Sequence, residues 1–298
     1  MLHKILKSIG VGALLILPSA SAFAQLPVNG FYSNKGDLTL AVSYSNKSAD
    51  DFYVGPDLAG AIPAELGEIS SDIISIYAQY GISDTFSAIV TLPYISVESE
   101  AGVADPVNGT STVDGLQDLG LSIKGKILEK DFGGAGDITL GAAGGVSFPV
   151  SDYAGGGILS IGNQATAITG EAIFQYNSPF KVFTELQLGY STRSSDEFDV
   201  PDALLYSAKI GYIHKYFYIH SQFTVHDSTD GVDILGEGFS GPEILPETEV
   251  DYKILSFSLY VPVYEDKIGV SLGYETTVDG RNFNDESGIG FGLVYCLR

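Results

Sequence analysis

The sequence contains no tryptophan, one cysteine, and only 15 lysine and arginine residues against 37 aspartates and glutamates. The lone Cys296 excludes an intrachain disulfide framework. The net charge of −22 argues against nucleic acid as a partner, because phosphate binding needs a basic surface. No apolar run of about 18 residues follows the N-terminal region, so the sequence predicts no transmembrane helix in the exported chain.

The first 24 residues have the pattern of a cleaved secretory signal peptide. Lys4 and Lys7 give a positive start, residues 9–17 form a short apolar run, and Ala22-Phe23-Ala24 is a small-x-small cleavage site. Cleavage leaves 298 − 24 = 274 residues and a charge of −24, because two lysines are removed. We expect residues 25–36 to form a short periplasmic lead-in before a single domain over residues 37–298. An exported chain of this size without disulfides must be stabilised by closure, by size or by lipid.

Alternating segments recur along the whole domain. In residues 118–128, Leu119, Leu121 and Ile123 share one parity, whereas Lys124 and Lys126 share the other. Successive side chains of a strand point to opposite faces, so one face is apolar and the other polar. Ten residues or so is also the length that a tilted strand needs to cross a bilayer. Twelve such segments are predicted as strands, over residues 37–45, 72–80, 85–94, 118–128, 137–148, 167–176, 181–190, 204–213, 217–226, 252–261, 267–276 and 288–297.

The connections between these segments alternate in length. Those after odd-numbered segments are mostly long: 46–71, 95–117, 149–166, 191–203, 227–251 and 277–287. Those after even-numbered segments are short: 81–84, 129–136, 177–180, 214–216 and 262–266. An even-numbered antiparallel barrel with long outer loops and short periplasmic turns gives this asymmetry. The sequence therefore predicts an all-β, twelve-stranded transmembrane barrel with both termini on the periplasmic side.

Three further features favour lipid over a protein core beside the apolar face. The opposite face consists of Gly, Ser, Thr and Gln with occasional charges, which suits a partly filled lumen. Acidic residues gather in the long connections, with eight in residues 227–251 and no Lys or Arg there. A secreted β-sandwich or soluble barrel would also alternate, but it would not explain the loop asymmetry. Tyrosines of the apolar parity lie near strand ends, where aromatic girdles belong: Tyr44, Tyr80, Tyr94, Tyr176, Tyr190, Tyr206, Tyr212, Tyr274 and Tyr295.

The polar face supplies the candidate functional residues. Barrels of about eight strands are filled by side chains and those of about sixteen hold a channel, so twelve strands leave two interpretations open. The inward charges either line a selective pore or plug the lumen with salt bridges. In both cases we expect Lys124 and Lys126 to pair with Glu171 or Glu185, because unpaired charges in a narrow lumen are costly. The predicted pore-lining residues are Lys124, Lys126, Glu171, Glu185, Gln187, Lys209, Gln222 and Glu275.

The remaining histidines, acidic residues and serines do not form the pattern of a metal or catalytic site. His220 and His226 lie six residues apart in one strand, roughly 20 Å, and so cannot share a metal ion. The acidic stretch that includes Asp227, Asp230 and Asp233 does not match an EF-hand loop and is interpreted as solvated. No serine motif stands beside a histidine as a nucleophile would require. We expect no catalytic residue, cofactor or metal, and interpret Cys296 as a small inward-facing residue.

Two short motifs carry a resemblance to a known family. Val90-Thr91-Leu92-Pro93-Tyr94, followed by Gly115-Leu116-Gln117-Asp118-Leu119-Gly120-Leu121, resembles the "LPY … GLGDL" pattern of the outer-membrane transporters named for the meta pathway of phenol degradation. Gln117 replaces the second glycine of that pattern. Residues 145–151 are similar to the family's later "lPTG" segment but lack its Thr-Gly. The resemblance implies an outer-membrane barrel that admits small aromatic or other hydrophobic molecules.

We therefore predict an outer-membrane channel of a Gram-negative bacterium for passive uptake of small molecules. Its expected partners are outer-membrane lipid and lipopolysaccharide, the permeant, and the barrel-assembly machinery during biogenesis. Two alternatives come from other classes: a non-conducting barrel that acts as a surface adhesin or anchor, and an outer-membrane hydrolase.

Overall fold

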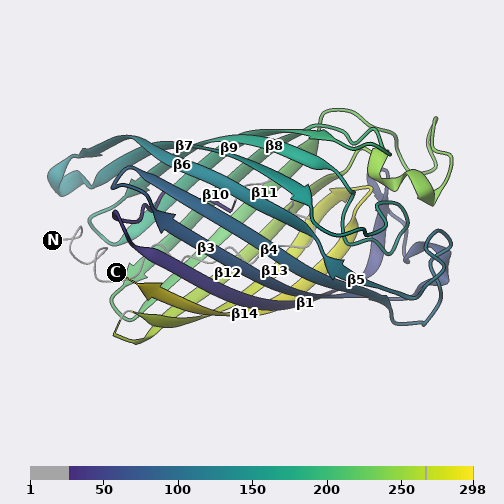
Figure 1. Cartoon of the computed structure of the whole chain (residues 1–298), viewed down its shortest axis with the longest axis horizontal. Coiled ribbons are helices and arrows are strands. Elements are labelled where there is room, and N and C mark those ends of the chain that lie inside the picture. The colour runs from purple at the N-terminus through teal and green to yellow at the C-terminus, as the bar shows by residue number, and fades with distance from the viewer. Residues whose placement is uncertain (1–26, 266, 298) are drawn as a thin grey trace.

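The computed structural model describes residues 27–265 and 267–297, so the predicted signal peptide lies outside the described residues. Within those residues, twelve long strands form one antiparallel sheet that closes into a barrel, because β14 pairs with β1 (Figure 1). Each pairs with its neighbours in chain order, as predicted. The long strands are β1 (Leu38–Val54), β3 (Ile69–Gly81), β4 (Phe86–Ser99), β6 (Asp118–Asp131), β7 (Asp137–Pro149), β8 (Thr166–Asn177), β9 (Val182–Ser194), β10 (Ala203–His214), β11 (Phe217–Ser228), β12 (Asp251–Tyr264), β13 (Ile268–Arg281) and β14 (Asn284–Leu297).

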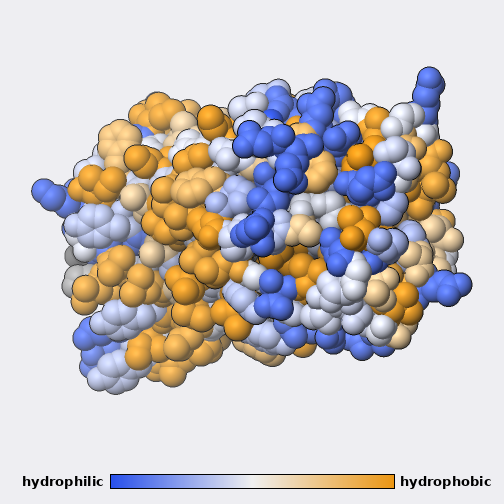
Figure 2. All heavy atoms as spheres, turned by 45° about the vertical axis from the view of Figure 1, so that its right-hand side comes forward, coloured by the Kyte–Doolittle hydropathy of each residue, from blue (hydrophilic) through white to orange (hydrophobic). Residues whose placement is uncertain are grey.

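The predicted alternation sets which side chains face outward. Val42 of β1 lies opposite Ile76 of β3 and Leu293 of β14, and these three side chains are 52%, 53% and 57% exposed. The next row, which includes Ser43 and Ser75, is buried inside the barrel. Figure 2 shows the resulting apolar surface over the wall, with hydrophilic residues prominent toward the loops. An apolar outer face with a polar interior is the inverse of a soluble protein and suits lipid surroundings.

Outward tyrosines mark the end of the wall from which the long loops emerge, here called the loop end. The hydroxyl of Tyr44 donates to Asp72 at 2.6 Å, and that of Tyr190 donates to Asp202 at 2.6 Å. Tyr94 makes the same kind of bond to Asp114 at 2.5 Å. Each tyrosine thus has an apolar ring on the wall and a polar partner above it, as interfacial aromatic residues do. The opposite end, where the C-terminus lies in Figure 1, is here called the turn end.

The strands extend further toward the loop end than the sequence predicts. β1 continues to Val54 rather than ending at 45, and β14 begins at Asn284 rather than at 288. The predicted long connection over 277–287 was wrong: β13 and β14 are joined across residues 282–283. Above the outward tyrosines the outward face turns polar while inward residues such as Phe52 and Ile69 are apolar, so the alternation that located the strands is lost there.

The loops between β1 and β3 and between β7 and β8 fold inward at the loop end. Ile62 and Leu66 from the first, with Leu159 and Ile161 from the second, pack on inward side chains of β1, β3 and β4. The loop end also contains β2 (Asp57–Leu58), β5 (Thr112–Leu116) and the 3-10 helices η2 (Pro63–Glu65) and η4 (Pro242–Glu247), whereas η3 (Gly133–Ala135) lies at the turn end. In the part of the chain that the structure describes, no helix is long and apolar enough to cross a membrane.

Candidate functional site

The predicted pore-lining residues all belong to the inward face of the wall. Glu275 and Lys126 retain side-chain exposures of 13% and 22%. The buried members are Lys124, Glu171, Glu185, Gln187, Lys209 and Gln222. Their placement inside the barrel follows from the alternation, whereas contact with a permeant stays a prediction.

A stretch of chain that precedes the wall occupies this interior. Residues 28–33, here called the N-terminal segment, lie between the inward faces of several strands, and Val28, Asn29 and Phe31 are buried. The ammonium of Lys124 donates to the backbone carbonyl of Asn29 at 3.0 Å, to its side-chain Oδ1 at 3.0 Å and to the carbonyl of Phe31 at 2.6 Å. One lysine of β6 therefore uses all three of its donors on this segment.

Glu185 of β9, three strands away from β6 around the wall, holds the same segment. Its Oε2 accepts the backbone N–H of Gly30 at 2.7 Å, and its Oε1 accepts bonds from Lys209 and Gln187, both at 2.9 Å. Gln187 also donates to the carbonyl of Val28 at 2.9 Å. Charge-assisted hydrogen bonds are about twice as strong as neutral ones, so Lys124 and Glu185 form a polar clamp around the segment.

Packing complements the clamp. The ring of Phe31 meets that of Phe183 edge-on at 5.2 Å between centroids, and that of Tyr218 at 6.3 Å. Gly30 lies so close to β8 that a Cβ there would fall 2.7 Å from the Cβ of Gln175. Only glycine fits that position, so the segment is matched to the wall in shape as well as in charge.

These contacts correct two expectations. Residues 25–36 are not simply a periplasmic lead-in, because the described part of that stretch enters the barrel. The expected partners of the lysines were also wrong: Lys124 binds the segment, and Lys126 pairs with Glu129 at 2.7 Å. Lys209 is the partner of Glu185 at 2.9 Å. The alternation places side chains on a face but does not fix which neighbours share a level of the barrel.

A second buried charge cluster was missed by the sequence analysis. Lys47 of β1 forms ion pairs with Glu275 of β13 and with Glu286 of β14, the latter at 3.1 Å. Gly288 makes this possible, since a Cβ there would stand 2.6 Å from Cγ of Lys47. Both Lys47 and Glu286 lie in the strand extensions that were interpreted as loops. A parity count continued past residue 45 would have placed Lys47 inside.

The acidic loop 229–250 is tied to the wall by Arg281 of β13. The guanidinium donates to both carboxylate oxygens of Asp233, at 2.8 and 2.6 Å, and lies 3.1 Å from Glu249. Asn282 adds a bond to Asp233 at 3.0 Å. The Arg281 guanidinium holds the pKa of the Asp233 carboxyl below its ordinary value. Asp233 thus serves as an anchor of the loop.

We expect Arg281→Ala to loosen this loop. The bidentate pair is partly exposed, so cleavage by a glutamate-specific protease at Glu237 and Glu243 should rise by roughly threefold to fivefold. Because the folded-state pKa of Asp233 is depressed, the anchoring is present above about pH 4 and is lost as the pH falls below it. Lys253→Ala, which removes an exposed pair with Asp279 at the same end, is the matched control. Unchanged proteolysis in Arg281→Ala would contradict the anchor.

Comparison with solved structures shows which known proteins share this fold. No protein-family model and no curated protein sequence matches the chain. A solved outer-membrane channel from Pseudomonas putida F1 superposes with a TM-score of 0.69 at 14% identity, covering 92% of this chain and 100% of that one. The fold is that of an outer-membrane β-barrel. The NanC porin superposes with a TM-score of 0.51 at 10% identity, over 86% of this chain and 98% of that one.

Proposed function

We propose that this chain is an outer-membrane channel for passive uptake of small molecules, with the N-terminal segment as its internal gate. The observation that carries the proposal is the way the lumen is filled. Much of the middle of the barrel is occupied by a short stretch that no strand contains and that polar bonds hold in place. A filling of this kind can leave the lumen without unfolding the wall, whereas side chains of the wall cannot.

The proposed path starts at the loop end, which faces the outside, and ends in the periplasm at the turn end. At the loop end the acidic loops meet lipopolysaccharide, to which divalent cations bridge them. A permeant passes the inward-folded loops and then the polar interior once the N-terminal segment has moved. The resemblance noted above supports small aromatic or hydrophobic permeants. Export through the signal peptide and insertion by the barrel-assembly machinery belong to the same proposal.

Replacing Lys124 with methionine tests the gate. The variant keeps the length of the side chain but removes three charge-assisted hydrogen bonds to the segment. If about 2 kcal/mol of the docking free energy is lost, the ratio of open to closed channels rises roughly 30-fold. Single-channel recording in planar lipid bilayers measures this ratio. Lys130→Met, on the exposed end of the same strand, should behave like the wild type.

The two other functional classes give different results in this assay. A surface adhesin or structural anchor would show no current from pure protein and no change on Lys124→Met, and that outcome would sink the channel proposal. An outer-membrane hydrolase would show lipid or ester turnover that one serine-to-alanine change abolishes. The solved structures that the chain resembles are described as a channel and a porin, which supports the channel.

A further inference from the structure

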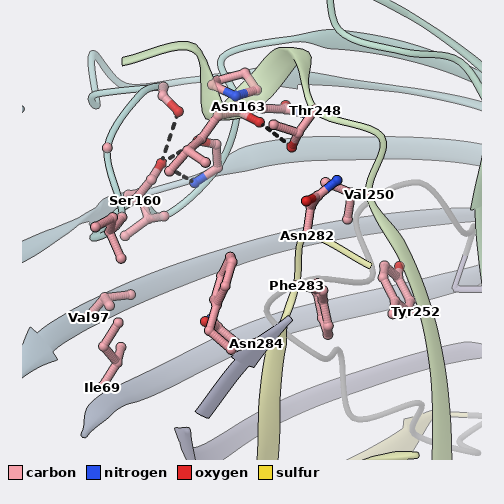
Figure 3. Close-up of a pocket in the computed structure, with 18 of the residues that line it drawn as sticks. Ile69, Val97, Ser160, Asn163, Thr248, Val250, Tyr252, Asn282, Phe283 and Asn284 are labelled. Carbon is pink, nitrogen blue, oxygen red and sulfur yellow. Dashed lines mark hydrogen bonds between the residues drawn. The ribbon is translucent and has the colours of Figure 1, made fainter. Parts of the chain in front are cut away.

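A cavity of about 240 Å³ lies at the loop end, inside the wall and beside the inward-folded loops (Figure 3). Its residues come from most of the barrel: β1, β3 and β4 on one side, and β9, β11, β12 and the β13–β14 turn on the other. Drug-sized ligands occupy pockets of about 300 Å³ or more, so this one suits a smaller molecule. It lies on the loop-end side of the barrel, away from the N-terminal segment.

One wall of the cavity is apolar. It is formed by Phe52, Ile69, Ile95, Val97, Ile158 and Ile161. Across from Ile69 and Val97, Figure 3 shows the rings of Tyr252 and Phe283 side by side. His226, Tyr252 and Phe283 form a stacked ladder, with centroid distances of 4.8 and 4.7 Å. An aliphatic or aromatic body fits between these two surfaces, since both are apolar and the rings present flat faces.

The polar side of the cavity contains a guanidinium whose buried Nε is unpartnered among the described residues. Arg193 of β9 is the one arginine or lysine among the described residues that line it. Its Nε is buried and has no hydrogen-bond partner among the described residues. The neighbouring carboxylate, Asp202, is engaged elsewhere: it accepts the backbone N–H of Arg193 at 2.8 Å and the hydroxyl of Tyr190 at 2.6 Å.

A second buried donor or acceptor faces the same space. Nδ1 of His226 is buried without a partner among the described residues, and the His226 side chain also lines the cavity. Glu286 is the acidic group of the lining, but its carboxylate is paired with Lys47 at 3.1 Å. Oδ1 of Asn284, another lining residue, is also buried without a partner among the described residues. Buried polar atoms are nearly always satisfied, so three such atoms around one cavity mark a place where a ligand supplies missing partners.

We infer that this cavity binds a small monocarboxylate with an apolar body, its carboxylate on Arg193 and its body between the apolar wall and the ring ladder. A guanidinium matches a carboxylate in geometry and charge, and a confined apolar cavity strengthens the interaction. This inference deepens the proposed function, because such a ligand would be a permeant held near the outer entrance. The acidic loops around the cavity make the selection stringent, since they repel anions that lack an apolar body to bury.

Calorimetric titration of the purified full-length barrel in detergent tests the inference. The probes are 3-phenylpropionate, its neutral analogue 3-phenylpropanol, and acetate. We expect 3-phenylpropionate to bind the wild type, and Arg193→Gln to weaken it about tenfold or more, the effect of losing one charge-assisted pair. Arg193→Lys should recover part of the affinity. Phenylpropanol should bind weakly and equally to wild type and Arg193→Gln, and acetate should not bind.

Controls separate this inference from the channel proposal. Lys253→Gln removes an exposed loop-end cation that does not line the cavity, and it should leave binding unchanged. Equal binding of phenylpropionate and phenylpropanol by the wild type, or no effect of Arg193→Gln in a folded barrel, overturns the inference. Binding without conductance in any variant removes the channel and leaves the carboxylate site. Conductance without binding of phenylpropionate removes the carboxylate site and leaves the channel.

Discussion

Deletion of residues 28–33 is expected to convert a mostly closed barrel into one that conducts continuously. The segment fills the space between Lys124 and Glu185, and its removal leaves polar side chains that water can solvate. The wall itself loses no strand pairing, because the deleted residues precede β1. Steady ion current in planar bilayers and faster swelling of protein-containing liposomes are the measurements. In Lys124→Met we expect shorter closed intervals, whereas in the deletion variant we expect no closed intervals.

A second variant keeps the test sharp if the deletion impairs assembly. Gly30→Val retains the length of the chain but places a side chain where Gln175 already lies. It should displace the segment and raise the open fraction, and the gel shift between folded and heated barrel reports whether the wall has formed. A folded deletion variant that remains as closed as the wild type would show that the loops at the other end, rather than the segment, close the channel.

Lys47→Met is expected to produce the largest loss of stability among single changes to the wall. It removes the ammonium that pairs with both buried carboxylates, Glu275 and Glu286. Removing one partner of a buried ionic cluster costs about 3–5 kcal/mol, because the remaining charge is uncompensated. Denaturant unfolding of the barrel in micelles, followed by the gel shift or by tyrosine fluorescence, measures the change.

The matching triple variant isolates the cause. Lys47→Met combined with Glu275→Gln and Glu286→Gln removes the charges together and should recover most of the stability, because neutral amides have no counter-charge to lose. Lys253→Met, which breaks an exposed pair with Asp279, should leave the unfolding midpoint unchanged. Loss of the same stability in the triple variant would mean that the packing of the Lys47 stem, and not its charge, matters.

The wall was predictable because one rule governs it. Each outward residue must be apolar and each inward one small or polar, so Val42, Ile76 and Leu293 can be assigned to a face without knowing their neighbours. The same rule placed Cys296 and the eight candidate lumen residues inside. It failed above the outward tyrosines, where the outward face is polar and the inward face contains apolar residues such as Phe52 and Ile69. That is why Lys47 and Glu286 were interpreted as loop residues although they lie in strands.

The contents of the barrel were not predictable in the same way. Residues 28–33 have no periodicity, and their place is fixed by partners far along the chain, such as Glu185 for Gly30. Arg193 and His226 reach one cavity from strands whose relative heights depend on the register of the whole sheet. A single sequence shows which face of its strand each residue occupies. It does not show the height along the barrel axis, which decides the residues that it meets on other strands.

The position of Gly30 against Glu185, 155 residues apart, has a consequence for assembly. The N-terminal segment is the earliest part of the described chain to be synthesised, yet its binding site is built from β6, β8 and β9. It can therefore dock only after those strands have been laid side by side, so its docking is a late, long-range step. A newly inserted barrel therefore has a closed wall before the N-terminal segment has docked, and under the proposed function the lumen is open to permeants until docking is complete.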